Sequence, residues 1–388
     1  MLNSKNIQVD NKKDASIELL RFIAMIMVVC CHVVPKFRDF CGLSESSDIS
    51  RIATTLLSWW GGLGVMIFII ISAWLLVDKK MKFIRIANIA IQAFVIRIVF
   101  MILDLVYMCV LYGASYTIKE WFLYELNELL SPLWCDDWYV TVYIIFLLIM
   151  PFLNLILHNI SPEKIRCGLI IFGFIPFLLN FQSAGLIFGG ILYFPYFYIL
   201  VGYLKLYKKD NVFSRKPALK FLVVAAVYLG TKYIISILPQ KGVLGVIGLF
   251  LPSTLGNDRG FSVIIGLMAL FLFYSLNGKN ICFPNVFRWL GKYAFLVYLV
   301  HQKLIKMYII DTNPSEMFWN ILKPYAIADE SWLYFLAVEL IVVITTYIAS
   351  VVIGIILDKC LIIPIRKFVY SKFNKQFEKV DLLYKSLT

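Results

Sequence analysis

The chain has 388 residues, of which 61% are hydrophobic, and it carries a formal net charge of +13. A soluble domain of this length does not need so much apolar content, and apolar runs of about 20 residues, the length of a membrane-crossing helix, recur along it. The positive charge argues little for nucleic-acid binding, because most of it falls between apolar runs. The sequence therefore predicts an all-α, polytopic transmembrane helix bundle.

Ten apolar stretches are predicted to cross the membrane. The first follows a polar segment and has no small-residue cleavage site, so we expect a retained span rather than a signal peptide. The segment 242–252 is apolar but short and rich in glycine, so a re-entrant or surface segment is favoured over a further span. The predicted spans are residues 17–35, 56–77, 83–113, 138–157, 167–182, 186–204, 218–238, 260–276, 288–310 and 331–357.

Lysine and arginine gather in alternate loops, and loops rich in these residues stay in the cytoplasm. This bias predicts that both termini are cytoplasmic. Residues 1–16 and 358–388 then form cytoplasmic tails, the second of them basic, around a transmembrane domain at 17–357. The basic residues of the predicted cytoplasmic loops are Lys79, Lys80, Lys82, Lys164, Arg166, Lys205, Lys208, Lys209, Arg215, Lys216, Lys279 and Arg288.

The first predicted span carries Glu18, Arg21 and His32. Eleven residues separate Arg21 from His32, almost a whole number of helical turns, so both side chains share a face and lie roughly 16 Å apart along the axis. Glu18 lies one turn before Arg21 and can pair with it. Polar groups inside a membrane helix are costly unless they meet partners or water, so this face is a candidate functional site. The alternative is that Arg21 is only a membrane anchor.

Other polar side chains lie inside predicted spans. Arg97 and Asp104 are two turns apart on the third span and can face one cavity, or form a purely architectural pair. His301 lies within the ninth span, where it either takes part in function or makes one interhelical hydrogen bond. Histidine titrates near neutral pH and can accept a proton from a hydroxyl group.

Three aromatic residues begin the fourth span: Trp138, Tyr139 and Tyr143. Such side chains suit the faces of sugar rings, but aromatic residues also anchor helices at membrane interfaces. The eight cysteines form no CxxC pair and no Cys/His metal spacing, so we expect no metal site.

Four stretches resemble, in order, motifs of the integral-membrane type 3 acyltransferase family. The first runs from Glu18 through Arg21 to His32 and resembles the arginine-to-histidine motif of the family's first helix. Two departures are visible: Ala73 replaces a glycine, and Arg85 stands alone among lysines where the family often has an arginine pair. The other three stretches are GVMIFIIISA at 64–73, DWYVTVY at 137–143 continuing to Pro151 and Asn154, and GKYAFLVYLVH at 291–301.

This resemblance implies transfer of an acyl group, usually acetyl from acetyl-CoA, to a hydroxyl of an exopolysaccharide or other cell-envelope glycan. It implies a multi-pass protein of the cell membrane, with a bacterial cytoplasmic membrane expected, an acyl-CoA co-substrate, a glycan or lipid-linked sugar acceptor and no permanently bound cofactor. A transporter, flippase or polymerase of glycan intermediates is the alternative, although the chain shows no internal repeat and no large outer loop.

The resemblance also suggests roles for the candidate residues. His32 would be the general base or briefly the acyl carrier, with Arg21 at the donor end and Glu18 orienting it. The remaining expected roles are donor binding by Arg85, acceptor binding by Trp138, Tyr139, Tyr143 and His301, and intramembrane polar support by Arg97, Asp104 and Ser72.

Overall fold

The computed structural model describes residues 14–42, 57–111, 123, 126, 138–178, 185–237, 263–306, 314–327 and 332–387. Within these residues every regular element is a helix, so the all-α prediction is confirmed. The elements are α1 (Ala15–Phe40), α3 (Gly61–Leu76), α4 (Phe83–Leu111), α6 (Trp138–Asn159), α7 (Pro162–Leu178), α8 (Gly185–Tyr207), α9 (Pro217–Ile237), α11 (Val263–Leu276), α12 (Pro284–Lys292), α13 (Ala294–Lys306), α14 (Pro314–Ile327), α15 (Trp332–Leu357), the π-helical η2 (Asp358–Ile362) and α16 (Ile363–Leu387).

Four described helices are long and apolar enough to cross a membrane: Ala15–Phe40, Phe83–Val106, Trp138–Asn159 and Tyr334–Ser386. Shorter apolar helices join them at Gly61–Leu76, Ile191–Tyr207, Pro217–Gly230, Ile264–Leu276 and Ala294–Ile305. The predicted ninth span is divided into α12 and α13, which meet at Tyr293. The number of ten spans and the cytoplasmic termini stay predictions, and residues 242–252 lie outside the described part of the chain.

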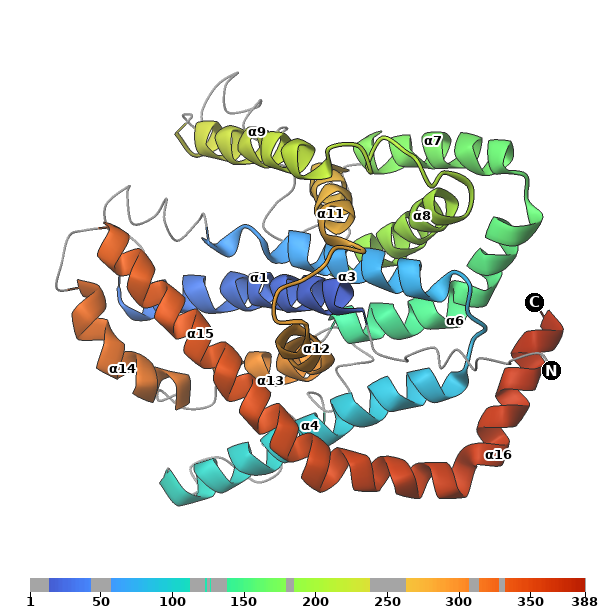
Figure 1. Ribbon diagram of the computed structural model, residues 1–388. Helices are drawn as coiled ribbons and strands as arrows, with labels where there is room; N and C mark the ends of the chain where they lie inside the picture. Colours follow the sequence, from blue (N-terminus) through green and yellow to red (C-terminus); the bar gives the residue numbers. More distant parts are fainter. Residues whose placement is uncertain are drawn as a thin grey trace, which may run out of the picture.

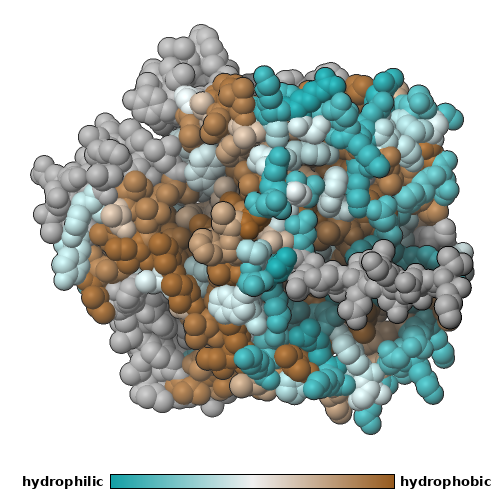
Figure 2. All heavy atoms as spheres, in the orientation of Figure 1, coloured by the Kyte–Doolittle hydropathy of each residue, from teal (hydrophilic) through white to brown (hydrophobic). Residues whose placement is uncertain are grey.

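Helix α1 lies at the centre of the bundle (Figure 1), where it packs against α3, α12, α13 and α15. Its buried side chains include large apolar ones such as Leu20, Met25 and Phe37. Figure 2 shows hydrophobic side chains over the left and centre of one face and hydrophilic ones at the right, near the ends of α6 and α16. This distribution is typical of a protein with an apolar belt and a polar membrane surface.

Glycines let the neighbouring helices approach α1 closely. A Cβ at Gly64 of α3 would overlap the backbone carbonyl of Ala24, and one at Gly291 of α12 would overlap Glu18. Small residues at helix contacts are the usual means of close packing in membranes, because backbones can then touch. The glycines of two of the quoted sequence motifs therefore set how closely α3 and α12 pack against α1.

The predicted basic tail at 358–388 is helical over its described residues. Arg366 Nη2 donates to Asp358 Oδ1 at 2.9 Å, and Tyr370 hydrogen-bonds Asn88 of α4. Figure 1 shows α16 continuing from α15 below α4 and then turning toward the start of α4. There the backbone N–H of Phe83 donates to Asp381 Oδ1 at 2.6 Å, so the last turns of α16 are bound to the bundle.

Replacing Gly64 by alanine is expected to lower the stability of the bundle by about 1–3 kcal/mol, the usual cost of overpacking. Gly230→Ala is the matched control, because a Cβ there meets no described atom within 4 Å and alanine favours a helix. Thermal unfolding in detergent measures both. Equal melting temperatures for the two variants would contradict the close contact at Gly64.

Candidate functional site

An ion pair lies near the start of α1. Asp14 caps this helix by accepting a hydrogen bond from the Ser16 amide at 2.8 Å, which fixes where the helix begins. One turn on, Arg21 Nη1 donates to Glu18 Oε1 at 2.7 Å, and these side chains are 25% and 2% exposed. Glu18 also lies against Gly291, so the carboxylate is fixed from two sides and orients the guanidinium group.

Arg21 lines an internal cavity of about 320 Å³ that is bounded by α1, α3, α4, α6, α12 and α13. A second cation, Lys292, lines the same cavity, as does the Ser72 hydroxyl, which lies 3.2 Å from the Tyr143 hydroxyl. The cavity thus combines positive charge with hydroxyl groups in an apolar surrounding. Its remaining lining residues are Val28, Val65, Phe68, Ile71, Ile89, Gln92, Tyr139, Gly291, Ala294, Phe295 and Tyr298.

Tyrosine rings form one wall of this cavity. Tyr139 and Tyr143 stack with an interplanar angle of 8° and centroids 5.8 Å apart, and the Tyr298 ring is 5.4 Å from that of Tyr139. Trp138 packs edge-on against Tyr139 at 5.9 Å. Two of the predicted acceptor-side residues therefore share a cavity with Arg21, and Trp138 supports them.

The two histidines inside the membrane-spanning part are in contact. His32 Nδ1 lies 3.1 Å from His301 Nε2, and His301 Nδ1 lies 2.8 Å from the Val297 carbonyl oxygen. A carbonyl oxygen only accepts, so His301 Nδ1 carries a proton and, in the neutral ring, Nε2 carries a lone pair. His32 then donates from Nδ1 and has its own lone pair on Nε2. His301, which is 0% exposed, thereby fixes the orientation of the His32 ring.

The histidine pair lies next to the cavity rather than in its lining. Val28, one helical turn before His32, lines the cavity, and so does Tyr298, whose ring centroid is 5.9 Å from that of His301. The face predicted on α1 thus runs from Arg21 at the cavity, past Val28, to His32.

Helix α4 carries the other predicted polar residues, and they lie elsewhere. Arg97 is buried and Asp104 is half-buried, and neither belongs to the described lining of the cavity, whereas Gln92 does. Arg85 lies in the first turn of α4, and its Nη1 is buried without a hydrogen-bond partner among the described residues. The supporting and donor-binding roles expected for these arginines stay predictions.

Sequence reasoning passed over three residues of this region. Lys292 and Tyr298 lie within a quoted motif, but only the cavity shows their place beside Arg21. Glu339 of α15 is 0% exposed. It is the one charged residue of the predicted tenth span, so the same rule that selected Arg97 would have found it.

In the described part of the chain, no group of three or more His, Cys, Asp or Glu side chains could hold a metal ion.

Comparison with known proteins gives one match. The family model described as "Acyltransferase domain" matches residues 14–357. The chain belongs to the type 3 acyltransferase family. No curated protein and no solved structure matches it. The family resemblance predicted from the sequence is confirmed, and the protein is a membrane acyltransferase.

In this acyltransferase, His32 is expected to be the Nδ1–H tautomer, because its Nδ1 donates to His301 Nε2. Nitrogen-15 NMR of the histidine-labelled protein at neutral pH distinguishes the two tautomers. In His301→Leu, which removes the acceptor, we expect His32 to change to the Nε2–H form. An Nε2–H tautomer in the unmodified protein would contradict the orienting role of His301.

Proposed function

We propose that this acyltransferase O-acetylates a hydroxyl of an exopolysaccharide or other cell-envelope glycan, with acetyl-CoA as the cytoplasmic donor. The observation that carries the proposal is the His32–His301 pair at 3.1 Å beside a cavity lined by two cations and stacked tyrosines. Acyl transfer from a thioester to an alcohol requires a base for the hydroxyl, positive charge for an anionic donor and a surface for the acceptor.

In the proposed reaction, His32 Nε2 removes the proton of the acceptor hydroxyl. At the same time, the hydroxyl oxygen attacks the carbonyl carbon of the thioester. A C–O bond forms and the C–S bond breaks. The leaving thiolate of coenzyme A then takes the proton from the His32 imidazolium, which restores the neutral base. In the alternative, His32 briefly carries the acyl group on the same nitrogen, and the acceptor attacks in a second step.

The cations and the tyrosine wall have separate roles in this proposal. Arg21, held by Glu18 at 2.7 Å, and Lys292 present positive charge to the acyl donor. Tyr139 and Tyr143, supported by Trp138, form the surface for the acceptor sugar. His301 acts through His32 as a positioning residue, in place of the acceptor contact expected from the sequence.

The cellular arrangement follows from the loop charges. With both termini in the cytoplasm, Arg21 lies toward the inner surface and His32 toward the outer one. A donor made in the cytoplasm would enter from the basic side, and the glycan would present its hydroxyl from the outside. We therefore propose a multi-pass location in the bacterial cytoplasmic membrane.

His32→Ala is expected to reduce acetylation of the surface glycan by about 100-fold or more, since general-base catalysis contributes roughly 10²–10⁴. Mass spectrometry of the glycan from cells with matched protein levels measures the acetyl content. Unchanged acetylation would remove His32 from the mechanism.

Arg21→Lys keeps the charge but loses the planar fork that pairs with Glu18. We expect a KM for acetyl-CoA about tenfold higher, equivalent to ~1.4 kcal/mol. Arg215→Lys is the matched control, because that arginine is 72% exposed and pairs with Asp210 in a loop. A KM in Arg21→Lys equal to that of the control would argue against donor binding by Arg21.

A further inference from the structure

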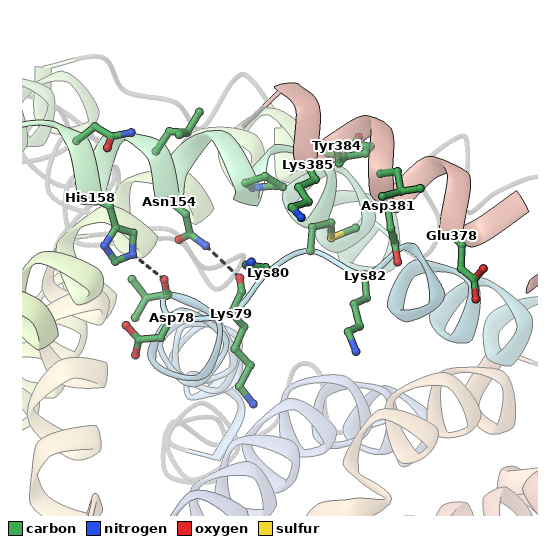
Figure 3. Close-up of a pocket in the computed structure, with 16 residues that line it drawn as sticks. Asp78, Lys79, Lys80, Lys82, Asn154, His158, Glu378, Asp381, Tyr384 and Lys385 are labelled. Atoms are coloured by element: carbon green, nitrogen blue, oxygen red, sulfur yellow. Dashed lines mark hydrogen bonds between the residues drawn. The ribbon is translucent and has the colours of Figure 1, made fainter. Parts of the chain in front are cut away.

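A second and larger hollow, which we call the α16 cleft, has a volume of about 970 Å³. Its walls are the turn at residues 77–82, the last turns of α6 and the last turns of α16 (Figure 3). The turn belongs to a predicted cytoplasmic loop, so the cleft is expected to open to the cytoplasm. A volume of this size is at the upper end of those usual for small-molecule sites, roughly 300–1,000 Å³.

Positive charge is in excess in the α16 cleft. Four lysines line it, Lys79, Lys80 and Lys82 from the turn and Lys385 from α16. None of these four has an ion-pair partner among the described residues. In Figure 3 the Lys385 side chain points from α16 toward the turn.

The acidic residues of the cleft already have partners. Asp78 Oδ2 accepts from Lys205 Nζ at 2.6 Å, so this carboxylate is paired with a lysine outside the cleft lining. Asp381 accepts from the Phe83 amide at the start of α4, and Glu378 accepts from the Asn374 side chain at 2.7 Å. With Asp78 paired, four lysines face the two remaining carboxylates, Glu378 and Asp381, so the lining keeps a net positive charge that suits an anionic ligand.

The backbone of the lysine-bearing turn is held in place by α6. Asn154 Nδ2 donates to the Lys79 carbonyl oxygen at 3.3 Å, and His158 Nε2 donates to that of Val77 at 3.2 Å (Figure 3). Tyr198 in turn donates to Asn154 Oδ1 at 2.7 Å. A fixed backbone with exposed ammonium groups suits a ligand that carries several phosphate groups, because each lysine acts as a mobile point charge.

We propose that the α16 cleft binds the phosphate groups of the acyl donor, with Lys80 of the turn and Lys385 of α16 contributing from two walls. This inference rests on the proposed function. The cavity at Arg21 has about 320 Å³ and suits only the acyl-bearing end of a nucleotide-linked donor, so the phosphorylated end needs a second site. The family match ends at residue 357, so α16 adds a wall from outside the matched domain.

The first experiment compares two donors, acetyl-CoA and acetyl-pantetheine, which lacks the nucleotide and its phosphates. Lys80→Gln and Lys385→Gln are each expected to raise KM for acetyl-CoA about fivefold, in line with loss of one solvent-exposed ion pair, with kcat unchanged. Neither should change KM for acetyl-pantetheine. Lys375→Gln, on the exposed part of α16 outside the cleft, is the matched control and should match the unmodified protein. An equal effect on both donors, or none on acetyl-CoA, would overturn the proposal.

The second experiment measures binding of adenosine 3′,5′-bisphosphate to the purified full-length protein by calorimetry, without any acyl transfer. Binding that weakens about 25-fold in the Lys80→Gln, Lys385→Gln double variant supports the cleft, as two independent fivefold losses predict. Absent or unaltered binding overturns it, as does lysine-dependent binding of short-chain phosphatidylglycerol alone, which would mean a lipid headgroup site. If the nucleotide binds as expected but the glycan gains no acetyl group, the proposed function fails while the phosphate site remains.

Discussion

The buried ion pair between Glu18 and Arg21 constrains the arrangement of the whole site. A carboxylate that is 2% exposed inside an apolar bundle is costly unless its charge is paired and its surroundings fit closely. Gly291 allows the close fit, because a side chain at this position would overlap Glu18. Helix α12 therefore packs directly on α1, and this contact places Lys292 and the start of α13 beside Arg21. Gly291 itself also lines the cavity.

Helix α13 links the two chemical parts of the acyltransferase. Its Tyr298 lines the cavity, and its His301, one turn further, touches His32 and the Val297 carbonyl oxygen. A rotation of this helix would change the cavity wall and the orientation of His32 together. The predicted ninth span is divided at Tyr293. As a result, α12 contacts the ion pair through Gly291, while α13 contributes His301 to the histidine pair. The cavity, the histidine pair and the ion pair are thus connected through α12 and α13.

The proposed donor path would run from the expected cytoplasmic surface to the cavity along α3 and α4. The turn between them carries the lysines of the α16 cleft, while Ser72 of α3 and Gln92 of α4 line the inner cavity. The same pair of helices would then contact a long donor at both of its ends. The C-terminal helix would add a wall at the cytoplasmic end of this path, and its Asp381 contact with the start of α4 fixes the wall in place.

The sequence by itself determined the helical class, the family and the importance of the first helix. These depend on local information: long apolar runs, loop charges, and polar residues spaced by whole turns within one helix. It also selected His32, His301 and Arg21 one by one, because a polar group in an apolar run stands out. Glu339 was overlooked although it carries the same signal, and residues 242–252 fall outside the described chain.

Only the tertiary structure decided which of these residues meet. His32 and His301 are 269 positions apart, and nothing local relates them. Arg97 and Asp104 have the same intramembrane polarity as Arg21 but lie away from the cavity lining, because the side of a helix that faces a cavity depends on its neighbours. The predicted basic tail likewise became a cleft wall through contacts with α4 that no charge pattern encodes. Packing between distant helices decides which polar side chains meet, whereas the hydrophobic pattern predicts only the helices that carry them.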